Sequence, residues 1–477
     1  MKKLVTFSLT AIAAAVLLSG CGNNNTTTTS SAIPSGTLLV SRTNYAGTSG
    51  TVTVGQALPG GGNAVANGGY PEVFENEVPD ASFGVTSPIF IDQVNPTTGS
   101  VVNTLSIPDT QMSSSFSSKS ELAMNESLDG TAITFMGYVA PLNTLDVSNS
   151  NTAEAYDQTN PVASIYQRAV GQINLSNSTF SVIPVNAYSG NNGRAAVLAN
   201  GYYYTVGNAG NGSAEAAGLC QLSQNTGVQF IQAGVVDGGD TFPVGELVPT
   251  ANGALSATGC SATGYQYGYT VSQYSTTGVY SAAGTETGAQ KDDKTGKDNN
   301  FRGLTVFNNT LYTTKGSGSN GVDTVFQVGP TGSFANGAVL SNTAITILPG
   351  FNTLSEKTNE KTNPNGTVHP FGLWFANANT LFVADEGDGS TEGSTGKITQ
   401  YAGLEQWSYS STNSTWTLVA TYQGGLNINT ATVTATVTNP SPAAGDPATW
   451  NVYTDGLRNL TGETNANGSV TIYSTTS

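Results

Sequence analysis

Residues His369 to Ser390 read HPFGLWFANANTLFVADEGDGS, a stretch whose pattern recurs along much of the chain. An apolar segment, Pro370 to Ala376, is followed by an Asn-rich turn at residues 377–379 and by a second apolar segment, Thr380 to Ala384. Asparagine and glycine tolerate the positive φ angle that a tight hairpin turn requires. The stretch therefore predicts a β-hairpin, and His369, the one histidine of the chain, stands at its start.

The same two-stranded pattern occurs at four other places, each with a turn of asparagine, aspartate or glycine. These turns are Asp129-Gly130, Asn200-Gly201, Asn308-Asn309 and Asn467-Gly468. Small residues in the first strand of each copy suit a position where strands converge on a central axis, as in the innermost strand of a propeller blade. Because the mature chain has no sustained helical periodicity, we predict an all-β fold, a β-propeller, for residues 37–477.

The predicted propeller has seven blades and long loop insertions. Seven blades over residues 37–477 average about 63 residues each, whereas WD40-type blades take about 40–45 residues. Blades beyond the five hairpins are predicted at Phe83 to Pro108 and around Gly264 to Ser275. The segment Thr37 to Thr43 can complete the last blade by joining the two ends; the alternative is an imperfect ring in a truncated chain.

Several phrases of the sequence resemble known secreted proteins. Phe382-Val383-Ala384-Asp385 resembles the L-Y-V-A-D strand of extracellular bacterial propellers of the NHL and YVTN kind. Longer phrases, such as FSSKSELAMN from Phe116 and KTGKDNNFRGLTVFNNTLY from Lys294, resemble an uncharacterised family of secreted bacterial proteins over most of residues 37–477. The resemblance implies a secreted β-propeller and implies no known activity.

The first residues are typical of a secreted bacterial lipoprotein. Residues 1–20 combine two lysines with an apolar run from Leu4 to Leu18, as a signal peptide does. Leu18-Ser19-Gly20-Cys21 resembles a lipobox, which implies cleavage before Cys21 and lipidation of its thiol; the alternative is an ordinary signal peptide with an incidental cysteine. Residues 21–36 are then the lipidated cysteine and a flexible polar tether. The predicted location is the cell envelope, where the lipid anchors the protein to a membrane and the domain is periplasmic or faces the surface.

The charge of the chain excludes one class of partner. Charged residues make up 10% of the sequence, against about 25% in average globular proteins. The formal net charge is −16, and a surface of that sign repels phosphate backbones. We therefore predict no nucleic-acid partner.

Two cysteines, Cys220 and Cys260, remain apart from Cys21, in a compartment that is predicted to be oxidising. A disulfide between them closes a loop of 40 positions and contributes roughly 4 kcal/mol of stability in the chain-entropy model. Two separate buried thiols are the alternative, because spacing alone does not establish the geometry of a disulfide.

Polar residues stand at the openings of the predicted inner strands, where a propeller brings them to the mouth of its central channel. The candidate ligand-binding residues are Asn192, Arg194, Asn300, Arg302, His369 and Arg458. Convergent polar groups over an apolar barrel are typical of a binding site. The alternative is a channel plugged by ion pairs that fasten the blades. Buried arginines require acidic partners, and the candidates for these are Glu121, Asp298 and Asp455.

The sequence offers no catalytic residue. No Gly-x-Ser-x-Gly elbow surrounds a serine, and one histidine with three cysteines does not supply a typical zinc site. Calcium is the one cofactor considered, because the acidic stretches Asp292 to Asp298 and Asp385 to Gly389 carry oxygen ligands. Solvated acidic loops are the alternative, since neither stretch matches the EF-hand pattern.

Together these features predict a lipid-anchored extracytoplasmic β-propeller that binds a polymer, a glycan or a protein partner at one face of the ring. One alternative is a cation-dependent, lactonase-like hydrolase with its site at the central channel. The other alternative is an envelope scaffold protein. The three classes differ in whether they bind without turnover, turn over a substrate, or hold other proteins together.

Overall fold

The computed structural model describes the main body of the chain and a few short pieces around it. The described ranges are 32–44, 84–115, 122–153, 162–209, 226–234, 300–316, 321–336, 345–354, 367–387, 401–426 and 456–476, with the pieces 55–57, 63, 65–66, 74–75, 160, 242–243, 248–249, 265–266, 356, 428, 435–438 and 449–452. Over these ranges the elements are strands, apart from short 3₁₀ helices at Val147–Asn149 and Ser333–Asn336. The predicted all-β class is therefore confirmed.

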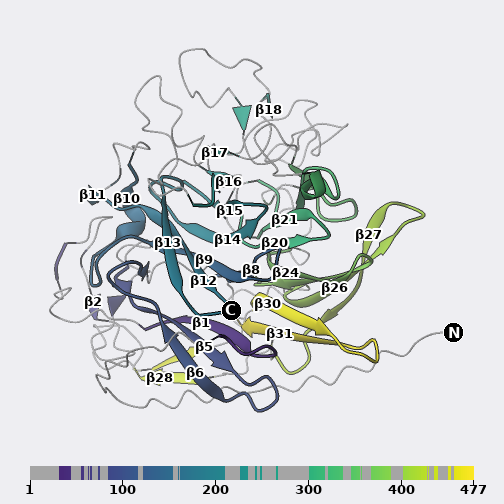
Figure 1. The fold of residues 1–477 in the computed structure, drawn as a ribbon, viewed down its shortest axis with the longest axis horizontal. Coiled ribbons are helices and arrows are strands. Elements are labelled where there is room, and N and C mark those ends of the chain that lie inside the picture. Colours follow the sequence, from purple (N-terminus) through teal and green to yellow (C-terminus); the bar gives the residue numbers. More distant parts are fainter. Residues whose placement is uncertain are drawn as a thin grey trace.

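Five antiparallel sheets form propeller-like blades, four of them with four strands (Figure 1). The four-stranded blades are β8 (Asn125–Glu126), β9 (Ala132–Tyr138), β12 (Arg168–Asn174) and β13 (Phe180–Val185); β14 (Gly193–Ala199), β15 (Tyr202–Gly207), β16 (Gly227–Gln232) and β17 (Phe242–Pro243); β20 (Leu304–Phe307), β21 (Thr310–Lys315), β22 (Thr324–Val328) and β23 (Ile345–Ile347); and β24 (Pro370–Asn377), β25 (Thr380–Asp385), β26 (Gly403–Ser410) and β27 (Thr415–Tyr422). The three-stranded blade has β5 (Ile89–Val94) between β1 (Leu38–Thr43) and β6 (Val101–Ser106).

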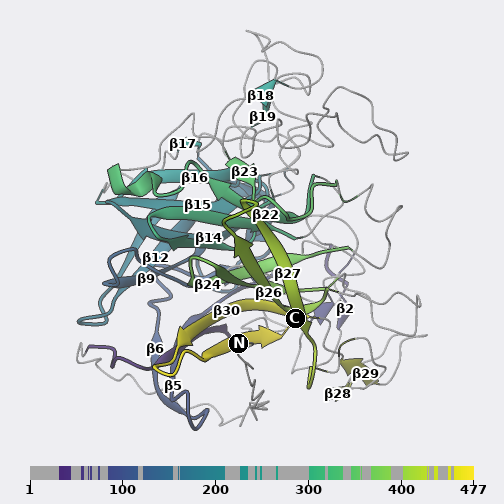
Figure 2. The ribbon, with the colours of Figure 1, turned by 90° about the vertical axis from the view of Figure 1, so that its right-hand side faces the viewer.

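Two-stranded sheets complete the described structure. They are β30 (Leu457–Thr464) with β31 (Val470–Thr476), β2 (Val65–Ala66) with β3 (Phe74–Glu75), β4 (Thr86–Ser87) with β7 (Ser114–Ser115), β10 (Ser150–Asn151) with β11 (Val162–Ile165), β18 (Val248–Pro249) with β19 (Tyr265–Gln266), and β28 (Ala435–Thr438) with β29 (Thr449–Val452). The first strands of successive blades are neighbours: β14 contacts β8 and β20, and β24 contacts β20 and β30. Figure 2 shows the sheets as successive layers, with β30 below β24 and β26.

The predicted hairpin turns are present where asparagine and glycine allow them. Asn200 and Gly201 join β14 to β15 with φ angles of 49° and 77°, and Asn308 and Asn309 join β20 to β21 with φ angles of 46° and 54°. Gly468 has a φ of 80° in the turn between β30 and β31. These left-handed conformations are cheap for glycine and tolerated by asparagine, which is why the turns could be recognised in the sequence.

The prediction of seven blades is wrong, because the described residues form five. The blade predicted at residues 83–108 exists as β5 and β6, which pair antiparallel. β1 pairs with β5, from Leu38 opposite Val94 to Thr43 opposite Ile89, and so does not complete the last hairpin. Of the blade predicted at residues 264–275, the structure describes Tyr265 and Gln266 alone, in the short strand β19. Dividing the chain into equal units assumed that blades fill residues 37–477 evenly, and the five described sheets are not evenly spaced along the chain.

Aromatic side chains fill the space between the sheets of the largest core. Phe307 and Phe375 stack with ring centroids 4.7 Å apart and join the β20 blade to the β24 blade. Tyr204 and Phe334 lie 5.1 Å apart and join the β14 blade to the β20 blade. Because aromatic rings bury large apolar areas, these contacts set the positions of neighbouring blades and of the strand ends between them.

Two glycines allow the β20 blade to lie directly against the start of β24. A Cβ atom at Gly303 would lie 2.0 Å from the carbonyl oxygen of Phe371, and one at Gly316 would lie 2.2 Å from that of Pro370. Thr314 Oγ1 also donates a hydrogen bond to the Phe371 carbonyl. This close contact of backbones places the end of β21 beside His369.

The proposed processing and cross-linking sites lie outside the described residues, which begin at residue 32; Cys21, Cys220 and Cys260 are among those not described. Within the described ranges, no helix has both the length and the apolar composition needed to cross a membrane.

Candidate functional site

Ionisable side chains gather where the β20 blade, the β24 blade and β30 meet. This ionisable cluster consists of Arg302, Lys315, Asp323, Glu356, His369, Asp385, Glu386, Glu405 and Arg458. Several of these residues stand at the ends of strands: Lys315 ends β21, Asp385 ends β25, and His369 directly precedes β24. Strand ends from different blades thus bring together residues that are up to 156 positions apart in the sequence, from Arg302 to Arg458.

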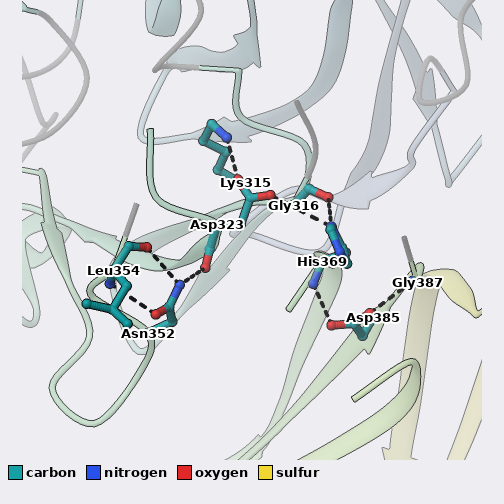
Figure 3. Close-up of polar contacts among 8 residues, drawn as sticks. All are labelled: Lys315, Gly316, Asp323, Asn352, Leu354, His369, Asp385 and Gly387. Carbon is teal, nitrogen blue, oxygen red and sulfur yellow. Dashed lines mark hydrogen bonds and ion pairs between the residues drawn. The ribbon is translucent and has the colours of Figure 1, made fainter. Parts of the chain in front are cut away.

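Lys315 and Asp323 form the buried floor of the cluster. Lys315 Nζ donates to Asp323 Oδ1, and both side chains are fully buried. Asn352 Nδ2 donates to the Asp323 carbonyl at 3.0 Å and to the Leu354 carbonyl at 3.1 Å, which holds the backbone around Asp323 (Figure 3). A buried ion pair gains enough attraction to offset desolvation only when its geometry is good and its remaining atoms are satisfied.

His369 is held by its backbone and by its ring. Its N–H donates to Asp385 Oδ2 at 2.6 Å, and its Nδ1 lies 3.2 Å from the carbonyl oxygen of Gly316 (Figure 3). The Gly387 N–H donates to Asp385 Oδ1 at 2.9 Å, so both oxygens of that carboxylate are used. Asp323 Oδ2 lies 3.8 Å from His369 Nδ1. His369 therefore has a buried carboxylate near its ring, Asp323, and another at its backbone N–H, Asp385.

The carboxylates determine the protonation of the ring. Burial alone lowers the pKa of His369, but Asp385, Asp323, Glu356 and Glu386 act in the opposite direction and raise its pKa above the ordinary value of 6.5. A neighbouring negative charge favours the charged form of an imidazole.

Negative charge exceeds positive charge within the cluster. Its five carboxylates face three permanent cations, which leaves two negative charges in excess when His369 is neutral and all five carboxylates are ionised. Burial raises the pKa of Asp385, and burial together with Asp385 raises the pKa of Glu405 well above its ordinary value. Trp407 Nε1 donates to Glu405 Oε2 at 2.8 Å and partly opposes this rise. Such a site favours the uptake of protons or of a cation.

The side of the cluster formed by Arg458, Glu386 and His369 is reachable by solvent. Arg458 Nε lies 3.1 Å from Glu386 Oε2, and these two side chains are 28% and 12% exposed, as against none for Lys315 and Asp323. His369 is 12% exposed. We call these three residues the rim. A partly exposed rim above a buried floor is an arrangement that a ligand can contact.

The six candidate residues from the sequence fall into different surroundings. His369 and Arg458 belong to the rim, and burial lowers the pKa of Arg302, which Glu386 and Asp323 partly counteract. Asn300 lies two residues before Arg302, with a buried Oδ1. Asn192 and Arg194 have other partners: Tyr138 OH donates to Asn192 Oδ1, and Arg194 Nη2 donates to Asn208 Oδ1 at 3.2 Å.

The acidic partners expected from the sequence lie outside the described residues, namely Glu121, Asp298 and Asp455. The partner observed for Arg458 is Glu386, and the charges of Glu386 and Asp323 act on Arg302 to raise its pKa. Sequence reasoning considered the starts of inner strands and missed Lys315, Asp323, Glu356 and Glu405, which stand at the ends of second strands or in later segments. Asp385 and Glu386 carried a signal, since both belong to the acidic stretch that was considered for calcium.

Comparisons with known proteins do not assign the chain to a family. No family model matches it, and no curated protein matches it. Among solved structures it is similar to an acylaminoacyl peptidase in complex with Z-Gly-Gly-Phe-chloromethyl ketone, at 8% sequence identity and a TM-score of 0.26. The similarity covers 71% of this chain and 42% of the peptidase chain. Similarity at this level indicates neither a shared activity nor a shared substrate.

Proposed function

We propose that the protein is a lipid-anchored, extracytoplasmic propeller-like protein that binds a polymer, a glycan or a protein partner at the rim of the ionisable cluster. The observation that carries this proposal is the convergence of Arg458, Glu386 and His369, which come from β30 and from either end of the β24–β25 hairpin and stay partly exposed over a buried charged floor. Charged and hydrogen-bonding groups that converge from separate elements can fix the orientation of a ligand.

The binding proposal is tested with the full-length protein, purified in detergent, on a glycan array and on immobilised envelope fractions. We expect retention without turnover. Arg458→Gln removes a rim charge, and we expect it to weaken retention by about tenfold, which equals about 1.4 kcal/mol. Asp109→Asn is the matched control, because Asp109 is an exposed carboxylate outside the cluster. Equal retention of Arg458→Gln and wild type would place the binding face elsewhere.

The anchoring proposal depends on Cys21 and on the signal peptide before it. Labelling of cells with a radioactive or clickable fatty acid is expected to mark the wild-type protein. Cys21→Ser is expected to lose the label and the membrane association together, since a multi-chain lipid anchor holds a protein stably on a membrane. Cys220→Ser is the control and is expected to keep both. A Cys21→Ser protein that stays membrane-bound would contradict the anchor.

A second candidate function is a cation-dependent, lactonase-like hydrolase with its site in the same cluster. One observation favours it: Asp323, Glu356 and His369 each offer a possible metal-ligand atom, and these atoms lie within 4.8 Å of one another. A panel of esters and lactones separates the two functions. Turnover that disappears on chelation and returns with a divalent cation supports the hydrolase, whereas retention without turnover supports the binding protein.

A further inference from the structure

Three side chains from separate segments meet at the floor of the cluster: Asp323 and Glu356 are buried, and His369 reaches them from the rim. Asp323 precedes β22, Glu356 lies between β23 and β24, and His369 precedes β24. The Glu356 N–H donates to the Gly321 carbonyl at 2.9 Å, which ties its backbone to the segment that leads to Asp323. One potential ligand atom of each residue lies within 4.8 Å of the other two. This separation is close to that of atoms that share a metal ion.

The hydrogen bond of the His369 ring leaves its other nitrogen available. The Gly316 carbonyl can only accept, so the contact at 3.2 Å requires Nδ1 to carry the proton. Nε2 is then a lone-pair donor, and it is buried with no hydrogen-bond partner among the described residues. Metal-binding histidines generally donate their second ring N–H to a carbonyl or carboxylate, which fixes the tautomer and the orientation of the ring.

Asp323 has one oxygen in use and one available. Oδ1 is paired with Lys315, whereas Oδ2 is buried and accepts no hydrogen bond from any residue that the structure describes. A buried carboxylate oxygen without a donor is costly. Figure 3 shows Asp323 and His369 facing each other, with Lys315 on the far side of the carboxylate. Lys315 thus fixes the orientation of Asp323 and leaves its second oxygen directed towards the histidine.

We propose that Asp323, Glu356 and His369 bind one divalent transition-metal ion of the zinc or manganese class, through a carboxylate oxygen of each acid and a ring nitrogen of the histidine. Ligands at about 2.0–2.2 Å from zinc are about 3.3–3.6 Å apart in a tetrahedral site. Asp323 Oδ2 and His369 Nδ1 are 3.8 Å apart, so a tetrahedral site requires the three side chains to move closer together.

The donor set distinguishes between classes of metal. Calcium takes six to eight oxygen ligands, whereas this site combines two carboxylates with one imidazole nitrogen. Imidazole suits zinc and other first-row ions, and carboxylates are shared by zinc and manganese. We therefore expect zinc or manganese in preference to calcium. This inference does not depend on the proposed ligand of the rim, because the metal ligands can be tested without any polymer, glycan or protein partner.

The test uses the untagged, full-length protein, stripped with a chelator and titrated by calorimetry with zinc, manganese and calcium chlorides. We expect one equivalent of zinc or manganese per chain, a higher thermal midpoint with the metal bound, and no comparable calcium binding. His369→Gln and Glu356→Gln are each expected to weaken metal binding more than about 100-fold, since loss even of a group that only orients a ligand costs 10–100-fold. Asp109→Asn is the control and is expected to bind as wild type does.

Far-UV circular dichroism shows whether each variant folds. If a variant does not fold, two further results test the proposal. Cobalt(II) added to the stripped wild-type protein is expected to give visible absorption of a four- or five-coordinate site, and zinc is expected to abolish it. A spectrum of six-coordinate hydrated cobalt, or stoichiometric zinc binding that persists in both folded variants, would overturn the proposal. In that case the three residues belong to an ion-pair network that fastens the blades. Failure of the rim to retain any partner would leave the metal result unaffected.

Discussion

At the scale of single residues, the cluster is defined by how each carboxylate is compensated. Asp323 is paired with Lys315, Asp385 accepts two backbone N–H groups, and Glu405 has the Trp407 indole as its donor. Neither Asp385 nor Glu405 has a cation at hydrogen-bonding distance among the described residues, but the charge of His369 favours ionised Asp385, whereas the charge of Asp385 repels ionised Glu405. Burial, together with the charge of Asp385, therefore raises the pKa of Glu405 well above its ordinary value of 4.5.

Glu405→Gln is predicted to stabilise the protein at neutral pH. The folded-state pKa of Glu405 is higher than its unfolded value, so the contribution of this group is complete below pH 4.5 and is lost as the pH rises towards the folded pKa. Glutamine keeps an oxygen that can accept from Trp407 but carries no charge. We expect its thermal midpoint to exceed that of the wild type by about 2 °C or more at pH 7.5, and to match it near pH 4.5.

Thermal unfolding over that pH range, followed by circular dichroism, measures the effect. Asp109→Asn, an exposed change outside the cluster, is expected to stay within about 0.5 kcal/mol of wild type at each pH. A Glu405→Gln variant that is less stable than wild type at pH 7.5 would show that the carboxylate is charged and well compensated in the folded protein.

At the scale of elements, the hairpins could be predicted from the sequence, but the strands from distant segments that pair or pack with them could not. Asn200-Gly201 and Asn308-Asn309 predict turns, because a tight hairpin turn needs positive φ angles that these residues tolerate. The pairing of β1 with β5 depends on two segments about 50 positions apart, and no local signal specifies it. The close contact between the β20 blade and β24 likewise depends on residues of two blades.

Gly303→Ala is predicted to destabilise this contact between blades. The added Cβ atom would lie 2.0 Å from the Phe371 carbonyl oxygen, so the backbone of one blade has to move. Overpacking of this kind costs about 1–3 kcal/mol, and denaturant unfolding at constant m-value measures it.

Gly424→Ala is the matched control, because a Cβ atom at Gly424 meets no atom within 4 Å. Its stability is expected to stay within about 0.5 kcal/mol of wild type. If Gly303→Ala were as stable as this control, the two blades would be packed less closely than the backbone contact at Phe371 indicates.

At the scale of the whole molecule, the number of blades follows from where the chain forms sheets rather than from its length. The main apolar core runs through the blades that begin with β14, β20 and β24, and other clusters serve the β5 and β9 sheets. The five described sheets are not evenly spaced along the sequence, so an average of about 63 residues per blade over residues 37–477 predicted more blades than the described residues contain.

The predicted disulfide between Cys220 and Cys260 acts on the whole chain, because a cross-link lowers the entropy of the unfolded state. We expect no free thiol from this pair in the unfolded, unreduced protein assayed with a thiol reagent. Reduction is expected to lower the free energy of unfolding by up to roughly 4 kcal/mol. Cys220→Ser under the same reducing conditions is the control and should show no additional loss. Two titratable thiols in the unreduced protein would contradict the disulfide.

The amino-acid sequence by itself determined the all-β class, the hairpin turns and the polar openings of the inner strands, because periodicity and turn chemistry are properties of short segments. It also pointed to His369, Arg302 and Arg458 as residues of interest. The tertiary structure alone decided that these three belong to one cluster with Lys315, Asp323 and Glu386, and that Asn192 and Arg194 have partners elsewhere. The physical reason is that burial and charge pairing depend on which strand ends meet, and packing between blades determines that over distances of more than 100 residues.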